Sequence, residues 1–111
     1  MKPYLSLVIP ARNEEENLGE TVRQLKPYLK DIPVEIIVVD DHSSDATAET
    51  ARKLSLEFPA LRLVSNQNQP GFASALAAGW KEARGEYVLP VMADGCDDPA
   101  TIPLMVRKAR E

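Results

Sequence analysis

Four short apolar segments, separated by segments with helical periodicity, constrain the fold of this 111-residue chain more than any other feature. We expect strands over Tyr4–Ile9, Val34–Val39, Leu61–Val64 and Tyr87–Met92, since each is rich in the large apolar residues that favour strands. The second segment is apolar without strict alternation, as is typical of a strand buried on both faces of a parallel sheet.

The intervening segments predict helices that each pack one apolar stripe on the sheet. The expected stripes are Leu18, Val22, Leu25 and Leu29 in the first, Thr47, Ala51, Leu54 and Phe58 in the second, and Phe72, Leu76, Trp80 and Ala83 in the third. The helix starts are expected at Asn13 with Glu16, at Asp45, after Pro70-Gly71, and at Asp98-Pro99.

This alternation predicts one α/β domain, a Rossmann-like parallel sheet with flanking helices in the order β-α-β-α-β-α-β-α. Ligands of such sheets bind beyond the carboxyl ends of the strands, so the residues that follow each strand are the candidate site.

Composition excludes several classes of protein. A net charge of -4 and a pI near 5.0 argue against binding to nucleic acid, which needs clustered cations. The single cysteine cannot form an internal disulfide, which favours a reducing, cytoplasmic location. The apolar stretch near the amino terminus is too short for a signal sequence, and no run is long enough for a transmembrane segment.

The first two strands are followed by polar loops. Pro10-Ala11-Arg12-Asn13-Glu14 either forms a plain capped turn or opens a helix whose amides face a nucleotide. Asp40 and Asp41 repel each other at the end of a buried strand, so we expect a metal or a donor-rich group such as a nucleobase to meet them. His42 is expected to be a turn residue.

The loops after the third and fourth strands differ in charge. Gly71 and the small residues after it suit either close approach to a phosphate or simple packing. The fourth loop carries Asp94, Asp97 and Asp98, and carboxylates are the ligands that Mg²⁺ and Mn²⁺ prefer. We assign Asp98 to the helix cap and expect Asp94 to be functional.

In order along the chain, these motifs resemble family 2 glycosyltransferases of the GT-A fold, most closely the dolichyl- or polyprenyl-phosphate sugar transferases such as the mannosyltransferases. The residues that carry the resemblance are Val8 to Leu18, Ile36 to Thr47, Gly71 to Gly79, and Ala83 to Val88. Together they cover essentially the whole chain.

The resemblance implies that residues 1–111 form the nucleotide-sugar-binding half of a GT-A domain, without the acceptor half. It implies a donor site at Pro10, Ala11, Arg12, Glu14, Asp40, Asp41, Gly71 and Asp94, and a Mg²⁺ or Mn²⁺ site at Asp94 and Asp97. The family's metal motif is Asp-any-Asp, but here Met92 replaces the first acid. The catalytic base is expected outside this chain.

The implied activity is an inverting transfer of a sugar from a GDP- or UDP-sugar to an acceptor, with a polyprenyl or dolichyl phosphate as the expected acceptor. The enzyme would then work in the cytoplasm or at the cytoplasmic face of a membrane, and this chain alone would be inactive.

Three alternatives stay open. The first is a non-catalytic module that binds a nucleotide sugar, suggested by Met92. The second is a receiver-like phosphoacceptor domain, although its acidic pair would follow the first strand. The third is a sugar nucleotidyltransferase, which would need a basic, glycine-rich first loop.

Overall fold

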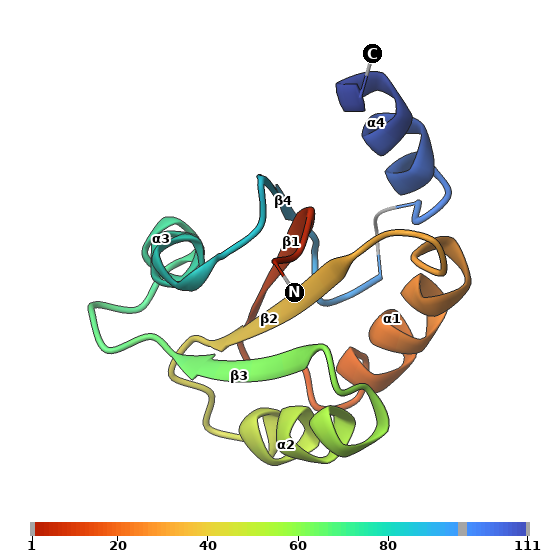
Figure 1. Ribbon diagram of the computed structural model, residues 1–111. Helices are drawn as coiled ribbons and strands as arrows, with labels where there is room; N and C mark the ends of the chain where they lie inside the picture. The colour runs from red at the N-terminus through yellow and green to blue at the C-terminus, as the bar shows by residue number, and fades with distance from the viewer. Residues whose placement is uncertain (1, 96–97, 111) are drawn as a thin grey trace.

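The computed structural model describes residues 2–95 and 98–110. This part of the chain forms a four-stranded parallel sheet with strand order β3-β2-β1-β4 (Figure 1). The strands are β1 (Leu5–Ala11), β2 (Val34–Asp40), β3 (Leu61–Ser65) and β4 (Tyr87–Pro90). All four expected strands are present and the predicted α/β class is confirmed.

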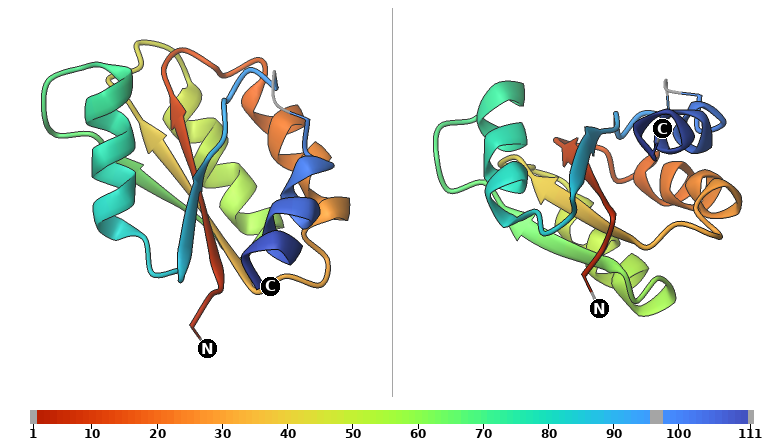
Figure 2. Two further views of the ribbon diagram at one scale, coloured as in Figure 1. Left: turned by 90° about the horizontal axis from the view of Figure 1, so that it is seen from above. Right: turned by 45° about the horizontal axis from the view of Figure 1, so that its top comes forward.

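Helices cover both faces of the sheet. They are α1 (Leu18–Leu25), continued by the 3-10 turn η1 (Lys26–Tyr28), then α2 (Thr47–Glu57), α3 (Phe72–Glu82) and α4 (Thr101–Arg110). Helix α3 lies on one face, and α1, α2 and α4 lie on the other (Figure 2, left). None of these helices is long and apolar enough to cross a bilayer.

The central strands supply both halves of the core because successive side chains point to opposite faces. Leu7 and Ile9 of β1 belong to the larger cluster under α1, α2 and α4, whereas Val8 joins Val39 of β2 in the smaller cluster under α3. These residues are fully buried. The apolar pattern of β2 therefore has the predicted cause, which is burial on both faces.

The predicted stripes are correct for the first two helices and half correct for the third, where Leu76 and Ala83 pack against the smaller cluster. In α3 the buried residues are Ala75 and Gly79, while Phe72 and Trp80 are 51% and 54% exposed. A Cβ atom on Gly79 would lie 2.4 Å from Cγ1 of Val8, so the helix can approach the sheet this closely only through its smallest residues. The two aromatic side chains of α3 consequently stay exposed, whereas Leu76 packs against the sheet.

Two helices begin later than expected because their predicted caps serve the loops before them. Helix α1 begins at Leu18 rather than near Asn13, whose φ of 55° places it in a left-handed turn. Helix α4 begins at Thr101, and the Asp98 carboxylate accepts a hydrogen bond from the Ala100 amide before it. The N-cap of α2 is Ala46, one residue after the expected Asp45, but Oδ1 of Asp45 accepts the amide of Thr47, the first helical residue, at 2.9 Å.

The strand order places a reversal of the chain between β1 and β4. The chain runs outward through β1, β2 and β3, then returns across the other face through α3 to pair β4 with the free edge of β1. The loops that leave the strands gather at one edge, uppermost in the left view of Figure 2. Such a reversal leaves space between the diverging loops, where ligands of open α/β sheets bind.

Candidate functional site

A pocket of about 280 Å³ opens at this carboxyl edge, at the reversal between β1 and β4. Its walls come from the loop after β1, the end of β2, the start of α3 and the loop after β4. The lining residues are Pro10, Ala11, Arg12, Glu14, Asp41, Gly71, Phe72, Met92, Ala93 and Asp94. Three carboxylates and one guanidinium thus share a small space.

Hydrogen bonds fasten the β1–α1 loop to the β2–α2 loop beside the pocket. Oδ1 of Asn13 accepts the Ser44 amide at 2.8 Å, and the Asn13 amide donates to Oγ of Ser43 at 3.0 Å. The Glu14 amide donates to Oγ1 of the fully buried Thr47 at 2.8 Å. These bonds fix the backbone of Glu14, so its side chain extends from a rigid turn.

The Glu14 carboxylate is incompletely paired within the described part of the chain. Its Oε2 atom is buried there without a hydrogen-bond partner. Burial, reinforced by the negative charges of Asp94 and Asp45, raises the pKa of the Glu14 carboxyl above its ordinary value of 4.5. A buried acceptor that feels two other carboxylates favours the arrival of a cation or a hydroxyl donor.

Asp41 is held by the loop that leads into α3. It is 4% exposed, its Oδ1 accepts from Nδ2 of Asn66 at 2.9 Å, and its Oδ2 accepts the Gly71 amide at 3.0 Å. Asp40, in contrast, accepts the Ser43 amide at 3.2 Å and is absent from the pocket lining. The donors that the sequence led us to expect from a ligand are therefore supplied, in part, by the chain itself.

The other residues expected at the site can be sorted into those that line the pocket and those that do not. Apart from Asp40, every residue expected at the donor site lines the pocket. Asp97, the expected second metal ligand, lies outside the described residues. Met92 and Ala93 line the pocket at the position of the metal motif, and Phe72 lines it although it was not expected there. The available signal for Phe72 was its position just after Gly71 at the carboxyl edge, which the helical-stripe argument obscured.

Two larger hollows lie elsewhere and carry less of this chemistry. One, of about 340 Å³, lies between α1, β4 and α4, and among the described residues Asp98 is its one charged lining residue. The other, of about 700 Å³, lies at the opposite end of the strands beside Lys2, Glu35 and Arg84. Neither contains Glu14 or Asp94, so the pocket at the reversal is the best candidate site.

The donor set of that pocket fits a hard divalent cation in part. Glu14 and Asp94 offer carboxylate oxygens, and the unpaired Glu14 oxygen is an acceptor that a cation would satisfy. In residues 2–95 and 98–110, however, no group of three His, Cys, Asp or Glu side chains comes together as a complete site. Ligand oxygens or water would have to complete the coordination, as is common for Mg²⁺ bound with phosphates.

Comparisons with known proteins agree with this geometry. The model of the Glycosyl transferase family 2 matches residues 6–111. The chain is 36% identical over 102 residues to the dolichol-phosphate mannosyltransferase of Pyrococcus furiosus, covering 92% of this chain and 29% of that protein. It is 41% identical over 105 residues to the dodecaprenyl-phosphate galacturonate synthase of Rhizobium johnstonii, covering 92% and 31%.

A solved structure shows the same fold. The mannosyltransferase of Pyrobaculum calidifontis, determined in complex with GDP-Man and Mn²⁺, superposes with a TM-score of 0.72 at 30% identity. The match covers 85% of this chain and 28% of that one, so the chain spans about a third or less of these relatives. Together with the family match over residues 6–111, this establishes that the chain belongs to glycosyl transferase family 2.

Proposed function

We propose that this chain binds a nucleoside-diphosphate sugar, with a divalent cation, as the donor-binding part of a family 2 glycosyltransferase. The observation that carries the proposal is the pocket at the β1–β4 reversal, where Arg12, Glu14 and Asp94 converge. The family match and the relatives named for dolichol- and dodecaprenyl-phosphate support the same activity. The nearest alternative is a non-catalytic binding module, which is favoured by Met92 in place of the first acid of the metal motif.

The charges of the pocket explain why a cation would be needed. A diphosphate entering beside Glu14, Asp41 and Asp94 meets three carboxylates and one nearby cation, Arg12. Carboxylates and phosphates that share a small pocket repel each other, and a divalent cation between them removes the repulsion. We assign Asp94, with Asp97 from outside the described residues, to the metal, and Glu14 to the nucleoside or to a metal-bound water.

The proposed reaction is an inverting displacement at the anomeric carbon. An acceptor oxygen attacks that carbon, the bond to the diphosphate breaks, and the nucleoside diphosphate leaves. When bound, the cation stabilises the charge that develops on this leaving group. We assign the acceptor site and the base that takes the acceptor's proton to segments outside this chain, which would leave the chain alone able to bind but not to transfer.

A polyprenyl or dolichyl phosphate is the acceptor that the relatives' names support. Such an acceptor is anchored in a bilayer by its hydrocarbon tail, whereas the nucleotide sugar is water-soluble. We therefore propose that the whole enzyme works at the cytoplasmic face of a membrane.

Calorimetric titration of the 111-residue chain with GDP, UDP and their sugar conjugates, with and without Mn²⁺, tests the proposal. We expect one nucleotide to bind with Mn²⁺ and to bind more than about tenfold more weakly after Asp94→Ala, since even indirect partners of a metal contribute about 10- to 100-fold. Asp98→Ala is the matched control, because Asp98 lies in the same loop but outside the pocket. Folded protein that binds none of these nucleotides would contradict the donor-site assignment.

A further inference from the structure

Phe72 is an exposed aromatic side chain on the wall of the pocket. It is the first residue of α3, it is 51% exposed, and it lines the pocket next to Gly71 and Asp41. The other strongly exposed aromatic side chain of this helix, Trp80, is absent from the pocket lining. An aromatic face left open to solvent on the wall of a pocket is a surface on which a flat ring can stack.

The backbone that carries Phe72 is held in place from two directions. The Gly71 amide donates to Oδ2 of Asp41, and Gly71 adopts φ 147° and ψ 153°, a conformation that residues with a Cβ rarely adopt. Nδ2 of Asn66 donates to Oδ1 of Asp41 and lies 3.2 Å from Oγ of Ser74, the third residue of the helix. The start of α3 is therefore tied to the end of β2 through a buried network.

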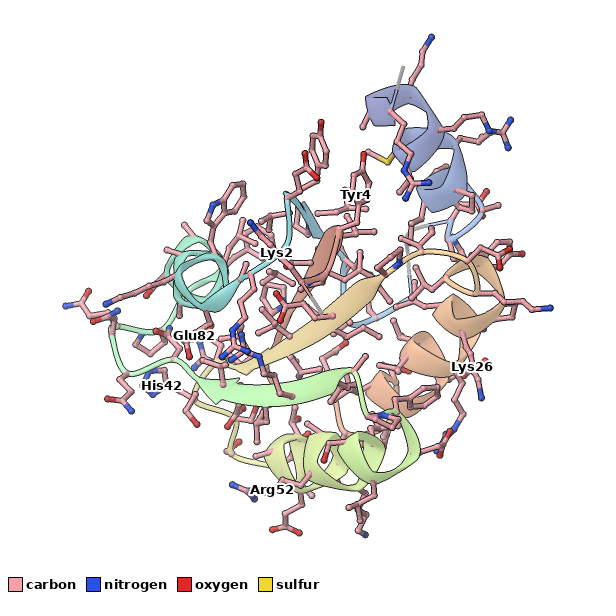
Figure 3. The ribbon with its side chains drawn as sticks, in the orientation of Figure 1. Lys2, Tyr4, Lys26, His42, Arg52 and Glu82 are labelled. Carbon is pink, nitrogen blue, oxygen red and sulfur yellow. The ribbon has the colours of Figure 1, made fainter. Side chains whose placement is uncertain are left out.

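A third contact holds the tip of the same loop. Nε2 of His42 lies 2.7 Å from the backbone oxygen of Asn68, and Figure 3 labels His42 beside the loop between β3 and α3. The His42 backbone has φ 57°, so this residue adopts a left-handed turn conformation. Because the loop is fixed at Asn66, Asn68 and Gly71, the position of Phe72 is set before any ligand arrives.

We propose that Phe72 is a nucleobase-binding residue that stacks on the base of the donor, with Asp41 and Asn66 as its positioning residues. This inference rests on the proposed function. The nucleobase is the flat part of a nucleoside-diphosphate sugar, and base-aromatic stacking is strong and tolerant of sequence. Phe72 adjoins Gly71 and Asp41 in the pocket, whereas the cation and diphosphate are assigned to the Asp94 side.

The test measures binding of GDP, UDP and inorganic pyrophosphate, each with Mn²⁺, to the 111-residue chain and its variants. Phe72→Ala should weaken the binding of whichever nucleotide the wild-type chain takes, GDP or UDP, by about tenfold, within the range for loss of one stacked base, and leave pyrophosphate binding unchanged. Phe72→Tyr should restore nucleotide binding. Trp80→Ala is the matched control, since it removes a similarly exposed aromatic side chain of α3 outside the pocket, and it should change nothing.

Each other outcome separates the two proposals. Equal weakening of nucleotides and pyrophosphate by Phe72→Ala would overturn the stacking role, because pyrophosphate has no base. Unchanged nucleotide binding in Phe72→Ala would overturn it as well, while leaving the donor site intact. A wild-type chain that binds pyrophosphate but neither nucleotide would overturn the stacking role and the nucleotide assignment together.

Discussion

Two glutamates at opposite ends of the sheet show how differently the chain treats a partly buried charge. Glu35, in β2, is 9% exposed and has a full set of partners. Its Oε2 accepts from Oγ of Ser6 at 2.5 Å and from the Arg84 amide at 2.6 Å, and its Oε1 lies 3.5 Å from Nη2 of Arg62. Glu14, at the carboxyl edge, has a buried oxygen with no partner in the described part of the chain.

The pKa directions follow these contacts. Burial alone would raise the pKa of Glu35, but the hydrogen bonds from Ser6 and Arg84 and the charge of Arg62 outweigh it, and the pKa is lowered. For Glu14, burial and the charges of Asp94 and Asp45 act in the same direction and raise the pKa. The carboxylate of Glu35 is fully paired within the fold, whereas one oxygen of Glu14 has no partner in the described part of the chain.

The end of the sheet that contains Glu35 should tolerate substitution least. We expect Gly85→Ala, at this end, to lower the stability of the fold most. A Cβ atom at Gly85 would lie 2.5 Å from Oγ of Ser6 and 2.7 Å from its backbone nitrogen, so part of the clash is with backbone. We expect a loss of about 3 kcal/mol in the free energy of unfolding, the upper end of the usual cost of overpacking. Urea denaturation followed by circular dichroism measures it.

Gly95→Ala is the matching substitution at the carboxyl edge of the sheet. Gly95 follows β4, whereas Gly85 precedes it. Gly95 has φ 76°, but the nearest contact of an added Cβ is Oγ1 of Thr21 at 3.4 Å. The cost should be about 1 kcal/mol, from the left-handed backbone alone. Equal losses in the two variants would show that the two ends are not packed differently.

The second prediction concerns the two glutamates directly. Glu35→Gln replaces a carboxylate oxygen by an amide NH₂ group that faces the Ser6 or Arg84 donors or Arg62, and should cost about 2 kcal/mol of stability. Glu14→Gln removes a repelled charge and should cost nothing measurable, but it should weaken nucleotide binding. Denaturation and calorimetry on the same two proteins would reveal this crossed pattern.

One result would contradict the expected difference between Glu14→Gln and Glu35→Gln. If Glu14→Gln destabilised the chain as much as Glu35→Gln and left nucleotide binding unchanged, Glu14 would be a structural residue. The distinction between a carboxylate completed by the fold and one reserved for a ligand would then be lost.

The strands and the position of the candidate pocket could be predicted from sequence because both depend on local patterns. Apolar runs identify the strands, and polar residues after each strand identify the carboxyl edge. The exposed face of α3 could not be predicted, since it depends on the close contact of Gly79 with Val8 and Val39. The same error concealed Phe72 among supposed core residues.

The hydrogen-bond partners of the site carboxylates could not be predicted from the sequence either. Asp40 and Asp41 look equivalent in the chain, yet the fold gives Asp41 to the pocket wall and turns Asp40 toward Ser43. That difference arises from Asn66 and Gly71, which are distant in sequence from β2. The Ser6–Glu35–Arg84 network was missed for the same reason, because its members come from three separate segments.

The smallest effect expected is on the pH dependence of stability, and its sign differs between the two glutamates. A carboxyl with a lowered folded-state pKa contributes stability above its ordinary value of 4.5 that is lost as the pH falls further. A carboxyl with a raised folded-state pKa binds its proton more tightly when folded, so its deprotonation lowers stability as the pH rises above 4.5. The two side chains therefore act in different pH ranges.

Denaturation of the wild type, Glu14→Gln and Glu35→Gln at pH values from 7 down to 4 would separate these contributions. As the pH falls from 7 toward 4.5, the wild type should gain about 0.5 kcal/mol relative to Glu14→Gln, the size of a typical surface effect. Relative to Glu35→Gln it should keep a constant advantage down to about pH 4.5 and lose it below. A wild type that instead lost stability relative to Glu14→Gln on acidification would mean that the Glu14 carboxylate is stabilised in the fold, and that both ends of the sheet complete their charges alike.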